Sequence, residues 1–373
     1  MRLSTAFLAL PLATLVAAAP PAAASETTRT LKLELSPTTR FAVENLAGTM
    51  RVTTGSGDKV VAVATIHGES AALADSIRFE QVTGDEGVTT LRVIYPTDRY
   101  TTFRYPRSRE SDTSDSDKSW TGGWLSSWLG GSSSYTKYAG HKVKVSESTG
   151  VILYADVEVQ LPHRDLDGIF RNLIGRIDAQ GVEGTLMFDS ASGDITLQKA
   201  GGKITADTGS GDVKATGIEG AFIGDTGSGD IYLDGFHGES IKCDTGSGDL
   251  SIDAGKARKI AANTGSGDIH MHDVEAEDVL AETGSGDVTI EAGGDKLAKL
   301  KADTGSGDVT VRLSADASFE AMADLGSGDI VNHFRDAQPI IKDKEVIGYR
   351  RGAAHTRIDV GTGSGNFVIE PGS

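Results

Sequence analysis

Residues 204–233 decide the fold: I-T-A-D-T-G-S-G-D-V-K-A-T-G-I-E-G-A-F-I-G-D-T-G-S-G-D-I-Y-L. The phrase T-G-S-G-D occurs twice in this stretch, ending at Asp212 and Asp230. Related phrases end at positions 194, 249, 268, 287, 308, 329 and 366, so successive copies are 18, 18, 19, 19, 19, 21, 21 and 37 residues apart. A repeat of this length indicates stacked coils, because one such unit cannot bury its apolar face alone.

Apolar and polar residues alternate on both sides of each phrase. After the phrase the apolar positions are the first and third, as in Val213 and Ala215; before it they include Phe222 and Gly224. Alternation with a period of two predicts a strand with one buried face. The fold class predicted is therefore all-β, as a parallel β-solenoid with about 18–21 residues per coil. A row of antiparallel hairpins that turn at T-G-S-G-D is the competing arrangement.

The last interval of 37 residues is close to two coils, which predicts an excursion of the chain at Pro339–Tyr349. An earlier T-G-S-G-D ends at Asp58, but the polar Lys59 follows it, so the strand there is out of phase with the later copies.

Four regions are expected along the chain. Residues 1–24 have a basic Arg2, an apolar run and small residues before Ser25, which is typical of a secretory signal peptide. An N-terminal β region follows at 25–99, then a Ser/Gly/Trp-rich insertion at 100–140, and the β-solenoid with T-G-S-G-D corners at 141–373. No later segment is apolar enough to be expected to span a membrane.

The formal net charge of −17 makes nucleic acid and anionic lipid headgroups poor partners, because both are bound mainly through Lys and Arg. Cys243 is the single cysteine, so no intramolecular disulfide can form. It occupies a column of small residues, where it is expected to pack as a small hydrophobe rather than react.

Two further segments give the chain a family resemblance: V-E-V-Q-L-P at Val157–Pro162 and G-T-G-S-G-N-F-V-I at Gly361–Ile369. Together with the Ser-Gly-Asp corners, they resemble an exported β-strand-repeat family of unknown function whose members are described as candidate adhesins. The resemblance covers most of residues 30–371 except the Trp-bearing insertion. It implies a β-solenoid in the cell envelope and no established enzyme activity.

Two acidic motifs suggest chemistry. D-T-G-S, at Asp207, Asp225, Asp244 and Asp303, is also the active-site phrase of aspartic proteases, which need two such carboxylates facing each other across a cleft. Here the phrase recurs once per coil, so a structural corner explains it. The Asp residues that end the phrases could bind calcium, or could accept hydrogen bonds from Gly and Ser N–H groups of the corners. The second interpretation is preferred, since the nonapeptide calcium period is missing.

His270 and His272 form an H-x-H pair that the alternation places outward, but no third or fourth zinc ligand is identifiable. Exposed polar positions explain them more simply. The sequence therefore predicts no catalytic, cofactor-binding or metal-binding residues and no cofactor.

Trp120, Trp124 and Trp128 stand four residues apart in the insertion and would share one face of a helix. As an exposed interaction flap they could stack on sugars or enter a membrane interface. A flap that packs on the solenoid or caps it is the favoured alternative.

The predicted function is that of an exported, non-enzymatic β-solenoid of the cell envelope, periplasmic or at the cell surface, with an envelope glycan or protein as partner. The alternative is a polysaccharide-acting β-helix enzyme. Such an enzyme would need a cluster of Asp, Arg and Lys on one outward strand face. The outward positions after the phrases are instead mixed: Thr196, Lys214, Tyr232, Ser251, His270, Thr289 and Thr310.

Overall fold

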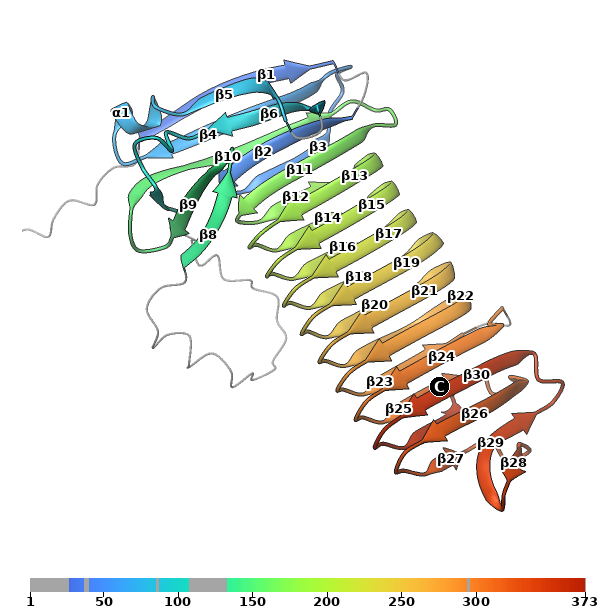
Figure 1. Ribbon diagram of the computed structural model, residues 1–373. Helices are drawn as coiled ribbons and strands as arrows, with labels where there is room; N and C mark the ends of the chain where they lie inside the picture. Colours follow the sequence, from blue (N-terminus) through green and yellow to red (C-terminus); the bar gives the residue numbers. More distant parts are fainter. Residues whose placement is uncertain (1–26, 37–39, 85–86, 107–132, 294–295, 373) are drawn as a thin grey trace, which may run out of the picture.

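The computed structural model describes residues 27–36, 40–84, 87–106, 133–293 and 296–372, which form thirty-one strands and one four-residue helix. Figure 1 shows a long rod of stacked coils that is broader at its N-terminal end. The predicted parallel β-solenoid is confirmed.

Each coil consists of two strands joined by a corner, which is T-G-S-G-D in most of the coils. The strands that lead into the corner form one face of the rod, the entry sheet: β11 (Asp167–Ile174), β13 (Glu183–Ser190), β15 (Gly201–Thr208), β17 (Glu219–Thr226), β19 (His237–Thr245), β21 (Lys256–Thr264), the second half of β22 (Ile269–Thr283) and β24 (Lys299–Thr304). The strands that leave the corner form the exit sheet: β12 (Ile177–Gln180), β14 (Ile195–Gln198), β16 (Val213–Thr216), β18 (Ile231–Asp234), β20 (Leu250–Asp253), the first half of β22, β23 (Val288–Ala292) and β25 (Val309–Leu313). A short return turn leads from each exit strand to the next entry strand.

Equivalent residues of successive coils lie side by side. Val213 pairs with Ile231 in the exit sheet, and Phe222 pairs with Ile241 in the entry sheet, both in parallel strands. This pairing excludes the antiparallel hairpin arrangement for the repeats.

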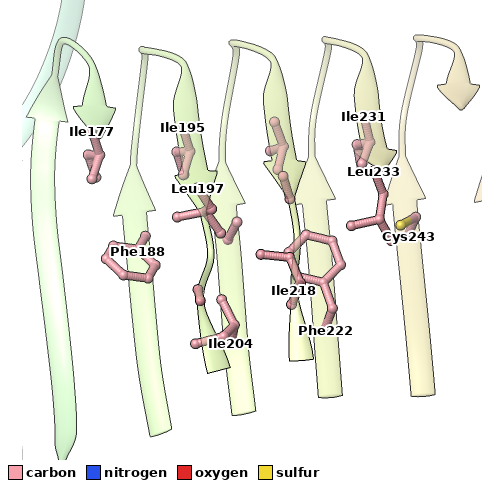
Figure 2. Packing of buried hydrophobic residues seen from close by; sticks show 14 of the residues in the cluster. Ile177, Phe188, Ile195, Leu197, Ile204, Ile218, Phe222, Ile231, Leu233 and Cys243 are labelled. Atoms are coloured by element: carbon pink, nitrogen blue, oxygen red, sulfur yellow. The ribbon is translucent and has the colours of Figure 1, made fainter. Parts of the chain in front are cut away.

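The inward residues fill the space between the two sheets (Figure 2). Ile195, Ile204, Phe222 and Leu233 are at most 1% exposed. Cys243 is also 1% exposed and lies in the predicted small-residue column, beside the Ala-sized positions of neighbouring coils. The core is thus a set of apolar ladders that run along the rod.

The stack begins earlier than the T-G-S-G-D repeats. β2 (Phe41–Ala47) pairs with β11, and β3 (Met50–Thr54) pairs with β12, so these two strands form a coil that precedes β11 and β12. Its corner reads N-L-A-G from Asn45, and the next coil repeats it as N-L-I-G from Asn172. The T-G-S-G-D that ends at Asp58 instead leads from β3 to β4 and is not a coil corner.

The remaining N-terminal strands extend both sheets and add a small third one, in which β7 and β8 pair with β9: β1 (Thr27–Leu35), β4 (Val60–Gly68), β5 (Arg78–Thr83), β6 (Thr89–Ile94), β7 (Thr102–Arg104), β8 (Ser133–Tyr138), β9 (His141–Ser146) and β10 (Val151–Leu161). β10 lies between β3 and β4 in the extended exit sheet, and β6 lies beside β2 in the entry sheet. The helix α1 (Ala71–Ala74) starts at the N-cap Ser70. Within the described part of the chain, no helix has the length and apolar character needed to cross a membrane.

The predicted insertion at 100–140 begins and ends in strands. β7 and β8 both pair with β9, and Phe103 and Tyr138 are buried. Residues 107–132, with all three tryptophans, lie outside the described residues.

The order of the last coils differs from their order in the sequence. β30 (Thr356–Thr362) lies between β24 and β26 (Phe319–Leu325), and β31 (Phe367–Pro371) lies between β25 and β27 (Ile330–Asn332). The coil of β26 and β27 is therefore outermost, and the C-terminal coil is inserted beneath it. The predicted excursion is the hairpin of β28 (Gln338–Lys342) and β29 (Glu345–Arg351), which pairs with β26 (Figure 1) and lets the chain return.

Candidate functional site

The corner phrase builds a ladder of hydroxyl hydrogen bonds along one edge of the rod, the corner edge. The buried Thr208 hydroxyl donates to the carbonyl of Gly193 in the preceding coil at 2.9 Å. The bond recurs in each following coil up to Thr304, and Thr362 donates in the same way to Gly307 at 3.1 Å. A buried hydroxyl is costly unless it is hydrogen-bonded, so these bonds explain how Thr is accommodated at this position.

The two glycines of the phrase allow neighbouring corners to approach closely. A Cβ atom at Gly229 would lie 2.1 Å from the carbonyl oxygen of Gly211, and a Cβ at Gly227 would lie 2.5 Å from that of Gly209. No side chain fits at these distances, so this spacing of the corners requires glycine at both positions.

The final Asp of the phrase forms a second ladder. Oδ1 of Asp212 accepts a hydrogen bond from the backbone N–H of Asp230 at 3.0 Å, and the pattern continues to Asp308, which accepts from the N–H of Asn366 at 2.7 Å. The prediction that Gly and Ser N–H groups donate to these Asp side chains is wrong. The donor is the backbone N–H of the equivalent Asp in the next coil. Burial, and then the neighbouring carboxylates, raise the pKa of Asp212 above its ordinary value.

A second acidic column runs beside the corner on the outward face of the entry sheet. Asp189, Asp207, Asp225 and Asp244 lie in register on successive strands, and the last three are the Asp residues of D-T-G-S. Burial raises the pKa of Asp207, and the like charges of its two neighbours raise it further. The carboxylates stand one above another on an open sheet face, which is the geometry of a repeated corner and not of a pair facing across a cleft.

His270 and His272 are both exposed, as the alternation predicts. His272 Nε2 lies 3.6 Å from a carboxylate oxygen of Glu291 on the next coil. Among the described residues, no group of three or more His, Cys, Asp or Glu side chains is placed to hold a metal ion. Burial, with a smaller contribution from Asp244, raises the pKa of the Cys243 thiol to about 12, so thiolate chemistry is disfavoured at neutral pH.

A polar cluster that the sequence pattern did not reveal joins the first corner to the N-terminal strands. His67 Nε2 lies 3.0 Å from Oδ2 of Asp156, whose Oδ1 accepts from the N–H and hydroxyl of Thr49 at 2.8 and 2.6 Å. Burial acts to raise the pKa of Asp156, but the hydrogen bonds from His67 and Thr49 outweigh it and lower the pKa. The His67 ring stacks on Tyr154 at 4.5 Å, and Tyr105 packs on Tyr154 at 5.1 Å.

A partly buried ion-pair network lies on the entry sheet near the same end. The two carboxylate oxygens of Glu44 are 2.6 Å from Nε of Arg92 and 3.1 Å from Nη1 of Arg171. Arg171 also contacts Asp189 at 2.7 Å, so its guanidinium neutralises the first member of the acidic column. These residues are far apart in the sequence, and only the strand order brings them together.

Comparison with known proteins places this architecture in a family. A family model described as Toastrack DUF4097 matches residues 154–370, more than half of the chain. The chain belongs to this family. The Toastrack match includes both columns of acidic residues at the corner edge and the inserted C-terminal coil. The N-terminal strands β1–β9 lie outside the match.

Several solved structures match the chain at low identity. A candidate cell adhesion protein from Clostridium sporogenes is 10% identical, with 93% of this chain and 100% of that chain covered and a TM-score of 0.23. A candidate lipid binding protein from Parabacteroides distasonis is 13% identical, with 91% and 96% covered and a TM-score of 0.40. A candidate adhesin from Bacteroides fragilis is 11% identical, with 93% and 99% covered and a TM-score of 0.34. No curated protein matches the chain.

Proposed function

We propose that the chain is an exported, non-enzymatic β-solenoid of the cell envelope that presents its outward faces to an envelope glycan or protein. The observation that carries the proposal is the regular outward array. Strands of neighbouring coils are roughly 4.8 Å apart, so each outward column offers one side chain per step along the rod. Such a surface can contact an extended partner at many points at once.

The outward face of the exit sheet has the mixed polar chemistry that such contacts need. Lys214, Tyr232 and Ser251 follow one another in register, and the Lys214 ammonium lies 5.6 Å from the centre of the Tyr232 ring. Hydroxyl, ammonium and aromatic groups on a flat surface suit the hydroxyl-rich face of a glycan.

Trp120, Trp124 and Trp128 are proposed as additional contact residues. They lie outside the described residues, and the support for them is their four-residue spacing in the sequence. Aromatic anchors usually dominate the energy of an interface, so a small number of such residues would suffice.

Glycan-array binding of the mature chain, with and without these tryptophans, tests the proposal. The test variant carries Trp120→Ala, Trp124→Ala and Trp128→Ala together, and the control carries Ser126→Ala and Ser127→Ala in the same segment. We expect the test variant to lose most of the glycan signal and the control to keep it. Binding that does not change would remove the tryptophans from the proposal, and the absence of any glycan or envelope-protein ligand would contradict the proposed function.

A further inference from the structure

One coil lacks the side chains that its neighbours carry at the return turn. Val182-Glu183-Gly184 and Ile218-Glu219-Gly220 are in register with Ala200-Gly201-Gly202, which lies between them. The outward glutamate of both neighbouring coils is replaced by Gly201, and an open hollow of about 730 Å³ lies in this edge of the rod. We call it the return-turn hollow. Its size is in the range of small-ligand sites.

Three charged side chains surround the return-turn hollow. Glu183 and Glu219 stand on either side of Gly201, with Cα atoms roughly 9.6 Å apart, which is two strand spacings. Lys199 is the third, at a position with a φ of 54°. Within the described part of the chain, none of the three forms an ion pair. Farther along the same edge, by contrast, Lys256 and Glu275 are paired at 2.9 Å.

The side-chain stems of Glu183 and Lys199 lie beside glycine backbone in the hollow. Cγ of Glu183 lies 3.7 Å from the place where a Cβ of Gly201 would be, and Cγ of Lys199 lies 3.8 Å from the corresponding point of Gly217. The floor between them is glycine backbone, to which a ligand can approach closely.

We propose that the return-turn hollow binds an amino sugar of a glycan. An ammonium group between Glu183 and Glu219 would donate charge-assisted hydrogen bonds to both carboxylates. Lys199 would donate a hydrogen bond to a hydroxyl oxygen of the sugar. A lysine side chain of a protein partner has no acceptor oxygen, so the presence of Lys199 favours a sugar over a peptide. The saturated ring would lie on the glycine floor. The site involves none of the tryptophans and is independent of them.

The direct test is isothermal titration of the mature chain with a tetramer of β-1,4-linked glucosamine. The N-acetylated tetramer is the matched probe, because it has the same chain and no ammonium groups. One charge-assisted hydrogen bond is worth about 1.5–3 kcal/mol, so the acetylated probe should bind more than about tenfold more weakly. Glu183→Gln combined with Glu219→Gln should weaken the glucosamine tetramer by at least the same factor.

Gly201→Gln separates this site from general attraction to the acidic rod, because it fills the return-turn hollow without changing the charge. An added Cβ there meets no atom closer than Cγ of Glu183 at 3.7 Å, so the variant should fold normally. Glu277→Gln, on the same edge but outside the hollow, is the control. We expect Gly201→Gln to abolish saturable binding and Glu277→Gln to leave it unchanged.

Equal binding of the two tetramers, no binding of either, or binding that survives Gly201→Gln would overturn this assignment. Tetralysine binding more tightly than the glucosamine tetramer would also overturn it, in favour of a cationic peptide. None of these results bears on glycan-array binding through the tryptophans or the exit sheet, so the two proposals can fail separately.

Discussion

Gly248 tests whether the glycines of the corner are required by the spacing of the coils. An alanine Cβ at this position would lie 2.0 Å from the carbonyl oxygen of Gly229 and 2.6 Å from its carbon, whereas Cβ atoms essentially never come within 3.0 Å of such atoms. The obstacle is backbone and cannot rotate away. The corner must therefore move by roughly 1 Å relative to the preceding coil.

The hydrogen bonds around the corner set the cost of that movement. The Thr245 hydroxyl donates to Gly229 at 2.9 Å, the Gly246 N–H donates to Thr226 at 3.1 Å, and the Asp249 N–H donates to Asp230 at 2.8 Å. A shift of about 1 Å takes all three beyond hydrogen-bonding distance. At about 1 kcal/mol each, Gly248→Ala should reduce the free energy of unfolding by about 3 kcal/mol.

Urea unfolding followed by circular dichroism measures this loss. Gly201→Ala is the matched control, because its Cβ meets only a side-chain atom at 3.7 Å, and it should change stability by less than about 0.5 kcal/mol. If Gly248→Ala were as stable as Gly201→Ala, the close stacking of the corners described here would be incorrect.

Three other predictions concern the strand faces, a return turn and the second acidic column. Ile252→Asp should destabilise the chain by more than about 4 kcal/mol, because it buries an unpaired charge in the core, whereas the outward Ser251→Asp should be nearly neutral; equal melting temperatures would contradict the assigned strand faces. Ala254 has a φ of 49°, where Gly235 of the preceding coil has 67°, so Ala254→Gly should stabilise by about 0.5–1 kcal/mol in the same urea assay, and a loss of stability would contradict this. Folding raises the pKa of Asp207, so the ionised carboxylate lowers the free energy of unfolding at any pH above the raised pKa. This loss of stability disappears as the pH falls below the pKa that Asp207 has in the unfolded chain. Asp207→Asn should therefore raise the melting temperature at neutral pH and leave it unchanged in acid; the reverse pattern would refute the assigned shift.

Much of the fold could be predicted from the sequence because its determinants are local and repeated. The alternation around each corner is visible within one coil, and the stacking of Val213 on Ile231 needs only the constant spacing of the phrases. The place of the last coil was not predictable. Phe367 and Ile330 both follow a corner and both fit beside Val309, and the hairpin between them decides which one does.

The candidate sites depend on relations between strands that local patterns do not contain. His67 and Asp156 meet because β4 and β10 pair antiparallel, although both residues appear in the sequence as ordinary outward positions. The return-turn hollow arises where Gly201 replaces the glutamate of both neighbouring coils, which is apparent only once the register is known. The tryptophans were predicted from their spacing, and that prediction is still to be tested.

The central claim is that the chain is a stack of parallel coils in register, with the C-terminal coil inserted before the last one. Disulfide formation tests it most directly, in a Cys243→Ala background. Thr310→Cys with Val368→Cys should form a disulfide, because these residues are paired across 58 positions of sequence at a strand spacing of about 4.8 Å. Thr310→Cys with Val331→Cys should not, because Val331 pairs with Val368 and lies one coil farther away. Peptide mapping after mild oxidation distinguishes the two variants, and the opposite result would contradict the coil order.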